Sequence, residues 1–324
     1  MEKVTCLCGK NEYNVLYLLE KEKDTYRIVK CRNCDLVYMN PRPTGPNIEK
    51  FYQKNYYYDE FTFDKDNFLK AKTLYRDIKK YLIKGSILDI GCSKGFFLNF
   101  MKEKNLSLHG IEPSTDSIRF AWNNFKIKID KGYIDSAKIE KNSYDNVTAI
   151  DIIEHVTNPN ITLKKIYQLL KKKGVAIIET PNIASFYHTI AKDRWMGFVL
   201  PFHLYYFTPK TLKRIFEKIG FKNIILETSH FNLISREGFF RSKGYGSFIL
   251  IRNILRMFKR NPDQMSNKIN KLIKDRLDKT SSKKFVPYDF SLLDRLENLL
   301  NRPLNYIFAK KLLSGDAIRI IAYK

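Results

Sequence analysis

The sequence predicts an α/β fold built on a doubly wound, mostly parallel sheet with an antiparallel edge strand. Three observations lead to this prediction. From about residue 86, apolar strand-like runs alternate with helix-like runs, which is the rhythm of consecutive βαβ units. A loop with two glycines joins the first of these strands to the first helix. The residues 317–323 alternate like one more strand, which we expect to pair antiparallel with 223–227 at the sheet edge.

Four of the five cysteines precede the predicted sheet in two close pairs. Cys6 and Cys8 form a C-x-C pair, and Cys31 and Cys34 form a C-x-x-C pair, with a strand-like segment between them. In a reducing cytosol, closely spaced thiols are more often metal ligands than disulfides, so this pattern predicts one tetrahedral Zn²⁺ bound by four thiolates. Such a closed site has a structural role, because it leaves no coordination position for substrate. Unmetallated thiols are the alternative, since two residues are the commoner gap within a pair.

The predicted elements follow in chain order. A zinc-ribbon-like module occupies 1–45, and a helical linker rich in Tyr and Phe occupies 46–84. The sheet domain is predicted over 85–230 and 316–324, with a basic helical insertion at 231–315. Within the sheet domain, further strands are expected at 87–90, 106–111, 127–130, 144–151 and 175–180, and helices at 96–104, after Ser114, at about 160–172 and at 209–219. The last helix has the clearest ends, because Thr208 is a good N-cap, Pro209 suits the first position and Gly220 suits the end.

The chain is strongly basic, with 58 Lys and Arg residues against 34 Asp and Glu residues and a formal net charge of +24. Between Arg241 and Lys311 the sequence has 17 basic and 6 acidic residues. Such an excess favours acidic partners, whether nucleic acid, an anionic membrane surface or phosphorylated substrates. Solvated lysine-rich helix faces explain it equally well. Apolar residues interspersed with the charges predict a lid over an acceptor site or, alternatively, a segment that lies on an anionic membrane.

The chain lacks the features that direct a protein into or across a membrane. Its first residues do not combine a basic region with an apolar stretch, as a secretory signal does. Its longest apolar runs stop far short of the roughly 18 residues that a membrane span needs. We therefore expect a cytoplasmic protein, which lies at the inner face of the membrane if the basic insertion binds lipid.

The segment Asp89–Gly95 lies between a predicted strand and a predicted helix, where open α/β sheets bind nucleotides and related ligands. Gly91 and Gly95 allow a sharp turn and a close approach to a ligand. About twenty residues later, Glu112 ends the next strand, from where its carboxylate can accept hydrogen bonds from both hydroxyls of a ribose. These features together predict a ligand that contains a nucleoside.

Two other interpretations of this loop fit less well. A dinucleotide site requires G-x-G-x-x-G, whereas here Ser93 stands between the two glycines. The segment also satisfies G-x-S-x-G, the pattern of a hydrolase nucleophile elbow, with Ser93 as the nucleophile. The chain upstream lacks the strands and the His-Gly oxyanion loop of such a hydrolase, which argues against that interpretation.

Several segments match a known set of motifs in the right order. L-D-I-G-C-S-K-G-F-F-L at 88–98 and G-I-E-P-S at 110–114 resemble motif I and the acidic motif of class I S-adenosylmethionine-dependent methyltransferases. Later segments resemble the downstream motifs of that family, namely Y-D-N-V at 144–147, D-I-I-E-H at 151–155, E-T-P-N at 179–182 and H-L-Y-Y-F-T at 203–208. The cysteine pairs, followed by L-V-Y-M-N-P-R-P at 36–43, resemble its zinc-ribbon-bearing branch. The resemblance covers about 6–230.

This resemblance implies a Rossmann-like fold and S-adenosylmethionine as the cofactor. It assigns the methionine end of the cofactor to the glycine loop with Asp89, Gly91, Ser93 and Gly95. It assigns the ribose to Glu112 and the wall near the sulfonium to Asp151. Ser93 departs from the glycine that is usual in the family, which restricts the backbone and lowers the expected cofactor affinity.

Methyl transfer from a sulfonium is an in-line displacement, so the protein mainly aligns the reactants and excludes water. An acceptor hydroxyl or amine must also lose a proton, which a neutral histidine can accept near pH 7. His155, just beyond the carboxyl end of a strand, and His203, in an aromatic loop, are the candidate bases. A purely structural role for each histidine is the alternative.

The acceptor is predicted by exclusion and by the resemblance. Methyltransferases that modify nucleic-acid bases commonly carry Asn-Pro-Pro-aromatic or Pro-Cys after the fourth strand, where this chain has D-I-I-E-H. Similar proteins often act on small molecules, sugars or lipid-linked glycans, which is the acceptor class we expect. A nucleic-acid-binding methyltransferase that uses the zinc module and the basic insertion is one alternative. A non-catalytic scaffold that binds the cofactor weakly through the Ser93 loop is another.

Overall fold

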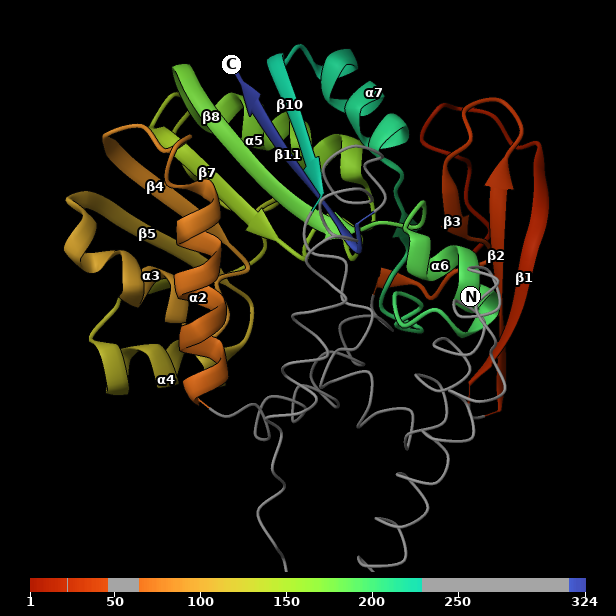
Figure 1. Cartoon of the computed structure of the whole chain (residues 1–324), viewed down its shortest axis with the longest axis horizontal. Helices are drawn as coiled ribbons and strands as arrows, with labels where there is room; N and C mark the ends of the chain where they lie inside the picture. The colour runs from red at the N-terminus through yellow and green to blue at the C-terminus, as the bar shows by residue number, and fades with distance from the viewer. Residues whose placement is uncertain (22, 46–63, 229–314) are drawn as a thin grey trace, which may run out of the picture. The chain divides into compact units, whose positions relative to one another are not determined.

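The structure is a computed structural model, in which residues 1–21, 23–45, 64–228 and 315–324 are described (Figure 1). The chain divides into two compact units. The larger comprises Met1–Ala184, Gly197–Ser229 and Ala317–Lys324, and the smaller comprises Ser185–Met196 and His230–Asp316. The predicted basic insertion, except for its last residue, and most of the aromatic part of the predicted linker lie outside the described residues.

A seven-stranded sheet forms the centre of the larger unit, in the order β10-β11-β8-β7-β4-β5-β6. Its strands are β4 (Gly85–Ile90), β5 (Leu106–Glu112), β6 (Ile129–Lys131), β7 (Tyr144–Ile150), β8 (Leu170–Pro181), β10 (Lys222–Thr228) and β11 (Ala317–Tyr323). Neighbouring strands from β8 to β6 are parallel, whereas β11 runs antiparallel to both β8 and β10. The predicted α/β fold with an antiparallel pair at the sheet edge is confirmed, with β10 outermost.

Helices cover both faces of this sheet (Figure 1). They are α2 (Asp64–Ile78), α3 (Phe96–Met101), α4 (Thr115–Phe125), α5 (Pro159–Leu169) and α7 (Pro209–Ile219). In β4, Ile87 packs in the buried cluster of α2 and α3, and its neighbour Leu88 packs in the cluster of α5 and α7. The middle of β8, Val175–Ile178, is continuously apolar and buried on both faces, as is typical of parallel sheets.

Helix α7 begins and ends where the sequence predicts. The hydroxyl of Thr208 accepts a hydrogen bond from the amide of Thr211, whose own hydroxyl accepts one from the Thr208 amide. This reciprocal cap satisfies two amides that a helix start otherwise leaves free. Gly220 ends the helix with a left-handed φ of +114°, which a glycine adopts without strain.

The junction between α5 and β8 differs from the prediction. The helix ends at Leu169, earlier than the predicted end near residue 172, and β8 follows at once. The cause is a contact with the far end of the chain. The amide of Lys173 donates to the carbonyl of Lys324 (3.3 Å), and the Lys324 amide donates to the carbonyl of Gly174 (3.0 Å). This pairing overrides the helix preference of the three lysines.

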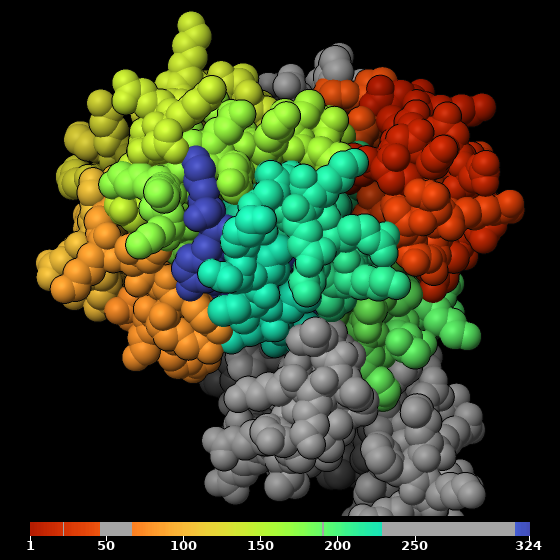
Figure 2. All heavy atoms as spheres, turned by 90° about the horizontal axis from the view of Figure 1, so that it is seen from above, coloured from red at the N-terminus to blue at the C-terminus, as the bar shows by residue number. Residues whose placement is uncertain are grey.

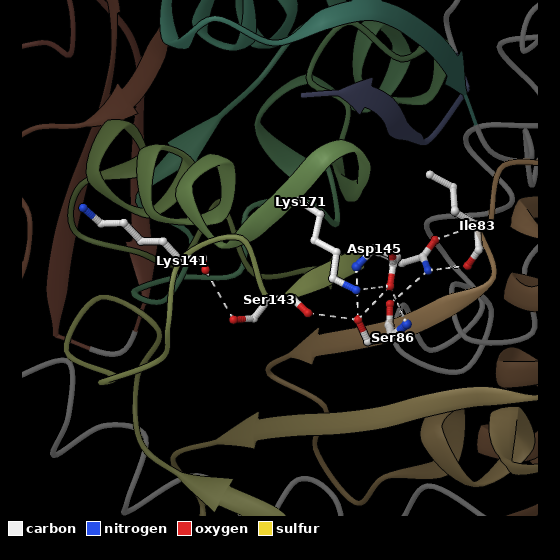
Figure 3. A network of polar contacts seen from close by, with 7 residues as sticks. Ile83, Ser86, Lys141, Ser143, Asp145 and Lys171 are labelled. Atoms are coloured by element: carbon white, nitrogen blue, oxygen red, sulfur yellow. Dashed lines mark hydrogen bonds and ion pairs between the residues drawn. The ribbon is translucent and has the colours of Figure 1, made fainter.

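A polar network joins β4 to β7 at the amino ends of these strands (Figure 3). The carboxylate of Asp145 accepts hydrogen bonds from the amide (2.8 Å) and hydroxyl (3.0 Å) of Ser86 and pairs with Lys171 at 2.8 Å. Burial opposes the negative charge, but the hydrogen bonds from Lys171 and Ser86 outweigh it and lower the pKa of Asp145. Gly85 has no room for a side chain, because a Cβ there would lie 2.1 Å from an Asp145 oxygen. The network therefore fixes the register of two central strands.

The cysteine module is a small antiparallel sheet within the larger unit. Strands β1 (Tyr13–Lys21), β2 (Asp24–Cys31) and β3 (Val37–Met39) pair in that order, and β3 also pairs with β9 (Tyr205–Tyr206). Buried side chains of the module, Val29 among them, belong to the same cluster as those of α5 and α7. In the space-filling view the module, in red, abuts the cyan segment that contains α7 (Figure 2). The module thus shares a core with the central sheet.

Of the smaller unit, the structure describes α6 (Phe186–Ala191), a 3₁₀ turn and the residues around them. The hydroxyl of Ser185 accepts a hydrogen bond from the amide of His188 (3.0 Å) and so caps α6. The ring of His188 lies edge to face against Trp195, with 5.1 Å between centroids. None of the helices in the described ranges is both long and apolar enough to pass through a lipid bilayer.

Candidate functional site

The loop between β4 and α3 contains three residues with a left-handed backbone. The φ angles are +68° at Gly91, +47° at Ser93 and +76° at Gly95. The Gly91 amide donates to the carbonyl of Ile111 (2.8 Å), which holds the loop beside the end of β5. A Cβ at Gly91 would lie 2.1 Å from the Cδ1 atom of Ile152. The turn therefore needs its two glycines, whereas Ser93 adopts a conformation that side chains disfavour.

Glu112, at the end of β5, is 2% exposed and faces this loop. One of its carboxylate oxygens accepts a hydrogen bond from the amide of Ser93 (3.0 Å), and the other accepts one from the amide of Ser114 (2.9 Å). Each oxygen has a second lone pair, so the carboxylate can also accept hydrogen bonds from a ligand. The structure thus brings together the glycine loop and the acidic residue that the sequence predicts as one site.

Asp89 lies in β4 just before the loop and is buried. Its Oδ1 atom accepts a hydrogen bond from the hydroxyl of Thr148 on β7, at 2.7 Å. Burial raises the pKa of Asp89 to about 7 against the effect of this hydrogen bond, and the charge of Glu112 adds to the rise. Two buried carboxyl groups therefore adjoin the loop, and such a pair favours a cationic ligand group.

Asp151 follows β7 at the carboxyl edge of the sheet. Since β7 pairs in parallel with β4, this is the edge from which the glycine loop also emerges. Asp151 has a left-handed φ of +54°, and its amide donates to the carbonyl of Glu179 on β8 (2.9 Å). Its side chain is exposed. The predicted wall residue therefore stands at the expected edge and is accessible there.

A second group of side chains joins the turn after β7 to the segment before β9. Glu154 is 1% exposed, and its Oε1 atom lies 3.9 Å from the Nε2 atoms of both His155 and His203. The two rings meet edge to face, with 4.5 Å between centroids. The Nδ1 atom of His155 lies 3.2 Å from the carbonyl oxygen of Phe202, and that of His203 lies 2.8 Å from the carbonyl oxygen of Gly197. The two candidate bases, distant in the chain, are thus neighbours.

These contacts determine which atoms of the histidines are available. A carbonyl accepts only from a protonated Nδ1, so the Nε2 of a neutral ring is left as the acceptor. Burial lowers the pKa of His203 to about 4 and that of His155 well below its ordinary value, and the proximity of His203 adds to the shift at His155. Burial and the nearby charge of Asp151 raise the pKa of Glu154 well above its ordinary value. These shifts favour the neutral forms of both rings and of the Glu154 acid.

Two members of this group were not among the site residues that the sequence predicts. The hydroxyl of Thr180, at the end of β8, donates to Oε2 of Glu154 at 2.9 Å. The Oε1 atom of Glu154 is buried and has no hydrogen-bond partner within the described part of the chain. The only signal for Glu154 was its place in D-I-I-E-H beside His155. Its unpartnered oxygen is recognised only from burial and interatomic distances, which a sequence pattern does not give.

The side chain of Ile152 connects this group to the glycine loop. Its Cδ1 atom occupies the space that a side chain at Gly91 would need. Its carbonyl oxygen accepts a hydrogen bond from the amide of His155, at 3.0 Å. The turn that carries Glu154 and His155 therefore packs directly on the loop after β4.

The four paired cysteines converge in the module. Their Sγ atoms all lie within 4.8 Å of one another, with 3.5 Å between Cys6 and Cys34 and 3.6 Å between Cys8 and Cys31. All four are free thiols. A tetrahedral zinc ion with Zn–S bonds of about 2.3 Å holds its thiolates about 3.8 Å apart. The cluster therefore fits the predicted ligand set, and the presence of the metal remains a prediction.

Residues 63–226 match a protein family described as a methyltransferase domain. The match begins just before α2 and ends within β10, so it covers half of the chain. It contains the glycine loop, Glu112 and the turn with Glu154 and His155, and it excludes the cysteine module.

Named relatives match a smaller part of the chain. The ubiquinone biosynthesis O-methyltransferase of Rickettsia bellii (strain OSU 85-389) is 30% identical over 118 residues, which are 35% of this chain and 47% of the relative. The mitochondrial ubiquinone biosynthesis O-methyltransferase of Rattus norvegicus is 30% identical over 129 residues, or 37% of each chain. The chain thus spans half or less of the length of these relatives. A solved SAM-dependent methyltransferase from Archaeoglobus fulgidus has a TM-score of 0.49 at 20% identity, covering 80% of this chain and 94% of that one.

Proposed function

The chain belongs to the class I S-adenosylmethionine-dependent methyltransferase family, and from this premise we propose that it transfers a methyl group from S-adenosylmethionine to a small-molecule acceptor. One observation supports the proposal above all. His155 lies on a turn that packs, through Ile152, against the glycine loop, and the ring of the buried His203 lies edge to face against it. A proton acceptor and the cofactor loop are thus adjacent, as methyl transfer to a hydroxyl or amine requires.

The proposed cofactor site is the carboxyl edge of β4, β5 and β7. When bound, S-adenosylmethionine supplies a methyl group on a sulfonium ion. The proposed contacts are Asp89, Gly91, Ser93 and Gly95 at the methionine end, Glu112 at the ribose and Asp151 near the sulfonium. The two buried carboxyl groups at Asp89 and Glu112 support this assignment, because they favour the positive charge of the cofactor.

We assign the proton-accepting role to His155. Its side chain is 22% exposed, against 8% for His203, so an acceptor reaches it more easily. The contact of its Nδ1 atom with the Phe202 carbonyl favours the tautomer in which Nε2 is the proton acceptor. His203 packs edge to face on the His155 ring and holds it in place. His155 would take the acceptor proton while the loop and the turn align acceptor and methyl group and exclude water.

The proposed acceptor is a hydroxyl group on a small molecule. This rests on the relatives, which are named for O-methylation in ubiquinone biosynthesis. Sugars and lipid-linked glycans are the narrower acceptors that the sequence predicts within this class. The predicted contacts with a membrane surface or with nucleic acid depend on the basic insertion, and they remain predictions because that segment lies outside the described residues.

For the cysteine cluster we propose a structural Zn²⁺. Cys6, Cys8, Cys31 and Cys34 would supply four thiolates, which close the coordination shell and leave no position for a substrate. The ion would therefore stabilise the module without taking part in methyl transfer.

The test is mass spectrometry of a cell extract incubated with the full chain and S-adenosylmethionine that carries an isotopically labelled methyl group. We expect a labelled small-molecule product, reduced at least about 100-fold with His155→Ala, in line with the loss of a general base. His109→Ala is the matched control, because His109 bonds to Tyr144 and Asp130 instead of the site, and it should leave the yield unchanged. A full yield with His155→Ala would remove the proposed base. Absence of any labelled product, despite cofactor binding, would refute the transfer activity.

A further inference from the structure

We propose that Arg42, which lies in the cysteine module, is a positioning residue for the histidine pair. The catalytic meaning of this inference rests on the function proposed above. Arg42 lies outside the segment that matches the methyltransferase family. It acts through two other residues, one in the turn of His155 and one in the segment of His203.

Within the described part of the chain, the guanidinium of Arg42 makes three polar contacts. Its Nη1 atom donates to the carbonyl of Thr157 (2.7 Å) and to the hydroxyl oxygen of Tyr205 (3.1 Å). Its Nε atom donates to a carboxylate oxygen of Glu2 (2.9 Å). The side chain is 11% exposed, so these bonds form largely away from water, where they are stronger than on an open surface.

The two residues that Arg42 holds are each two positions from a histidine. Thr157 follows His155 in the turn after β7, and Tyr205 follows His203 at the start of β9. The hydroxyl of Tyr205 itself donates to the Thr157 carbonyl at 3.1 Å. One guanidinium group therefore fixes the distance between the two backbone segments that carry the rings.

The same segments are also joined by their backbones. The amides of Leu204 and Tyr205 both donate to the carbonyl of Glu154, at 2.8 and 3.2 Å. On its other side the Leu204 carbonyl accepts from the amide of Met39 in β3 (2.9 Å). Arg42 is anchored in the module by paired backbone bonds with Glu2, at 2.7 and 2.9 Å. The module thus contacts both histidine-bearing segments, and Arg42 supplies a side-chain contact to each.

The chemistry of arginine suits this position. A guanidinium group presents several donors in one rigid plane, so it can serve a carboxylate along one edge and two neutral oxygens along the other. A lysine has one donor centre and cannot span both sets. We therefore expect Arg42→Lys to retain only part of the positioning of the two histidines, and Arg42→Met to retain none.

Arg214→Met is a matched control. Arg214, on α7, donates from Nη1 to the carbonyl of Cys34 (2.9 Å), so it also joins the module to the central sheet domain through an arginine–carbonyl bond. Arg214 joins the module to α7, whereas Arg42 joins it to the turn after β7. A general loosening of the module would follow from either substitution, whereas loss of positioning would follow from Arg42→Met alone.

The experiment records imidazole resonances of the full chain labelled at histidine, with His155→Ala and His203→Ala used for assignment. In Arg42→Met we expect the resonances of His155 and His203 to shift and broaden, while that of His109 stays in place. Arg214→Met should leave all three unchanged. Affinity for S-adenosylmethionine should stay within about twofold, and kcat should fall by about 10- to 100-fold, as expected when aligned groups move slightly.

Unchanged resonances of His155 and His203 in folded Arg42→Met would overturn the inference. If that variant does not fold, Tyr205→Phe removes one hydroxyl and keeps the buried ring, and the same two resonances must then shift. The resonance measurement needs no substrate. A chain that neither binds cofactor nor transfers methyl groups would refute the proposed function and still leave the positioning role of Arg42 to be decided by the spectra.

Discussion

Ser93 occupies a backbone conformation that is costly for an L-amino acid. Its φ of +47° lies in the left-handed region, where a side chain costs roughly 1 kcal/mol or more relative to glycine. We expect Ser93→Gly to raise the free energy of unfolding by up to about 1 kcal/mol, less the entropy that glycine adds to the unfolded chain. If this strain also disfavours the loop conformation that binds the ligand, the affinity of Ser93→Gly for S-adenosylmethionine, measured by calorimetry, should be several-fold higher than that of the native chain.

Lys126→Gly is the control for this substitution. Lys126 ends α4 with a φ of +55° and is remote from the site loop in sequence, so its replacement should add stability without changing cofactor affinity. An affinity that rises equally in both variants, or in neither, would show that strain at Ser93 does not limit binding.

The buried histidines give methyl transfer a distinct pH dependence. The active form of the base is neutral, and burial lowers the pKa of His203 to about 4 and that of His155 well below its ordinary value of about 6.5. Activity should therefore persist as pH falls through 6.5 and should be lost only at lower pH. Protein stability also decreases toward acid pH. Below pH 6.5 the histidines bind protons in the unfolded chain but not in the folded one, so the free energy of unfolding decreases as the pH is lowered.

The measurement is kcat/KM against pH on the acid side, together with denaturant unfolding at each pH. The cofactor is kept saturating, so that titration of Asp89, whose pKa burial raises to about 7, does not limit its binding. Under this condition, an acid limb at pH 6.5 or above would contradict the assignment of His155 as base.

Single residues set the limit of prediction from this sequence. Gly91, Glu112 and the four cysteines are predictable, because each follows from a residue type at a required spacing. Glu154 is not, because its meaning comes from burial beside two rings and from one unpartnered oxygen. Arg42 is ordinary in sequence, and only the fold brings it to Thr157.

Among the elements, β11 depends on one buried cation. Arg319 is 6% exposed and holds Glu179 of β8 through Nε (2.8 Å) and Nη2 (2.7 Å), with Asp77 of α2 and Glu227 of β10 at 3.6 and 4.0 Å from Nη1. Arg319→Met would leave the partly buried Glu179 without this partner, so we expect a loss of about 3–5 kcal/mol of unfolding free energy. Arg76→Met, which removes an exposed pair, should cost less than about 1 kcal/mol in the same denaturant measurement. Equal losses would contradict a special role for Arg319.

Element ends were predictable where local chemistry decides them. Helix α7 follows its capping residues, and β11 matches the predicted 317–323, because alternation and buried β-branched residues are local signals. The end of α5 was not predictable, since the residues after Leu169 pair with Lys324. Strand β9 was missed for a similar reason. Its two residues form a strand only because β3 lies beside them.

On the scale of the whole molecule, the cysteine module and the central sheet share one core. Buried side chains at Cys6, Cys31 and Tyr38 belong to the same cluster as Leu212 and Phe216 of α7. If zinc binds, its removal should therefore lower the stability of the larger unit as a whole. We expect chelation to lower a single Tm, because structural zinc contributes directly to folding free energy.

Metal analysis checks this expectation. The purified chain should contain one zinc ion, and Cys31→Ser should lose most of it. Cys92→Ser should keep it, because Cys92 lies in the glycine loop and outside the cluster. A separate low-temperature transition of the module after chelation would contradict the shared core, and a chain purified without metal would contradict the zinc site.

The fold was largely predictable at this scale because the alternation of strands and helices is a local pattern that repeats along the chain. The docking of the module was not predictable, since β3 meets β9 across more than half of the sequence. That pairing is what places a cysteine-rich segment beside the histidine group.

The central claim is that the loop after β4 binds S-adenosylmethionine, and calorimetric titration of the full chain with this cofactor tests it most directly. We predict a saturable binding signal for the native chain and none for Gly91→Val, whose side chain would collide with Ile152 and strain a left-handed backbone. Gly45→Val, with open space around its Cβ, should bind like the native chain. Native affinity in folded Gly91→Val, or no heat from the native chain at millimolar cofactor, would contradict the account.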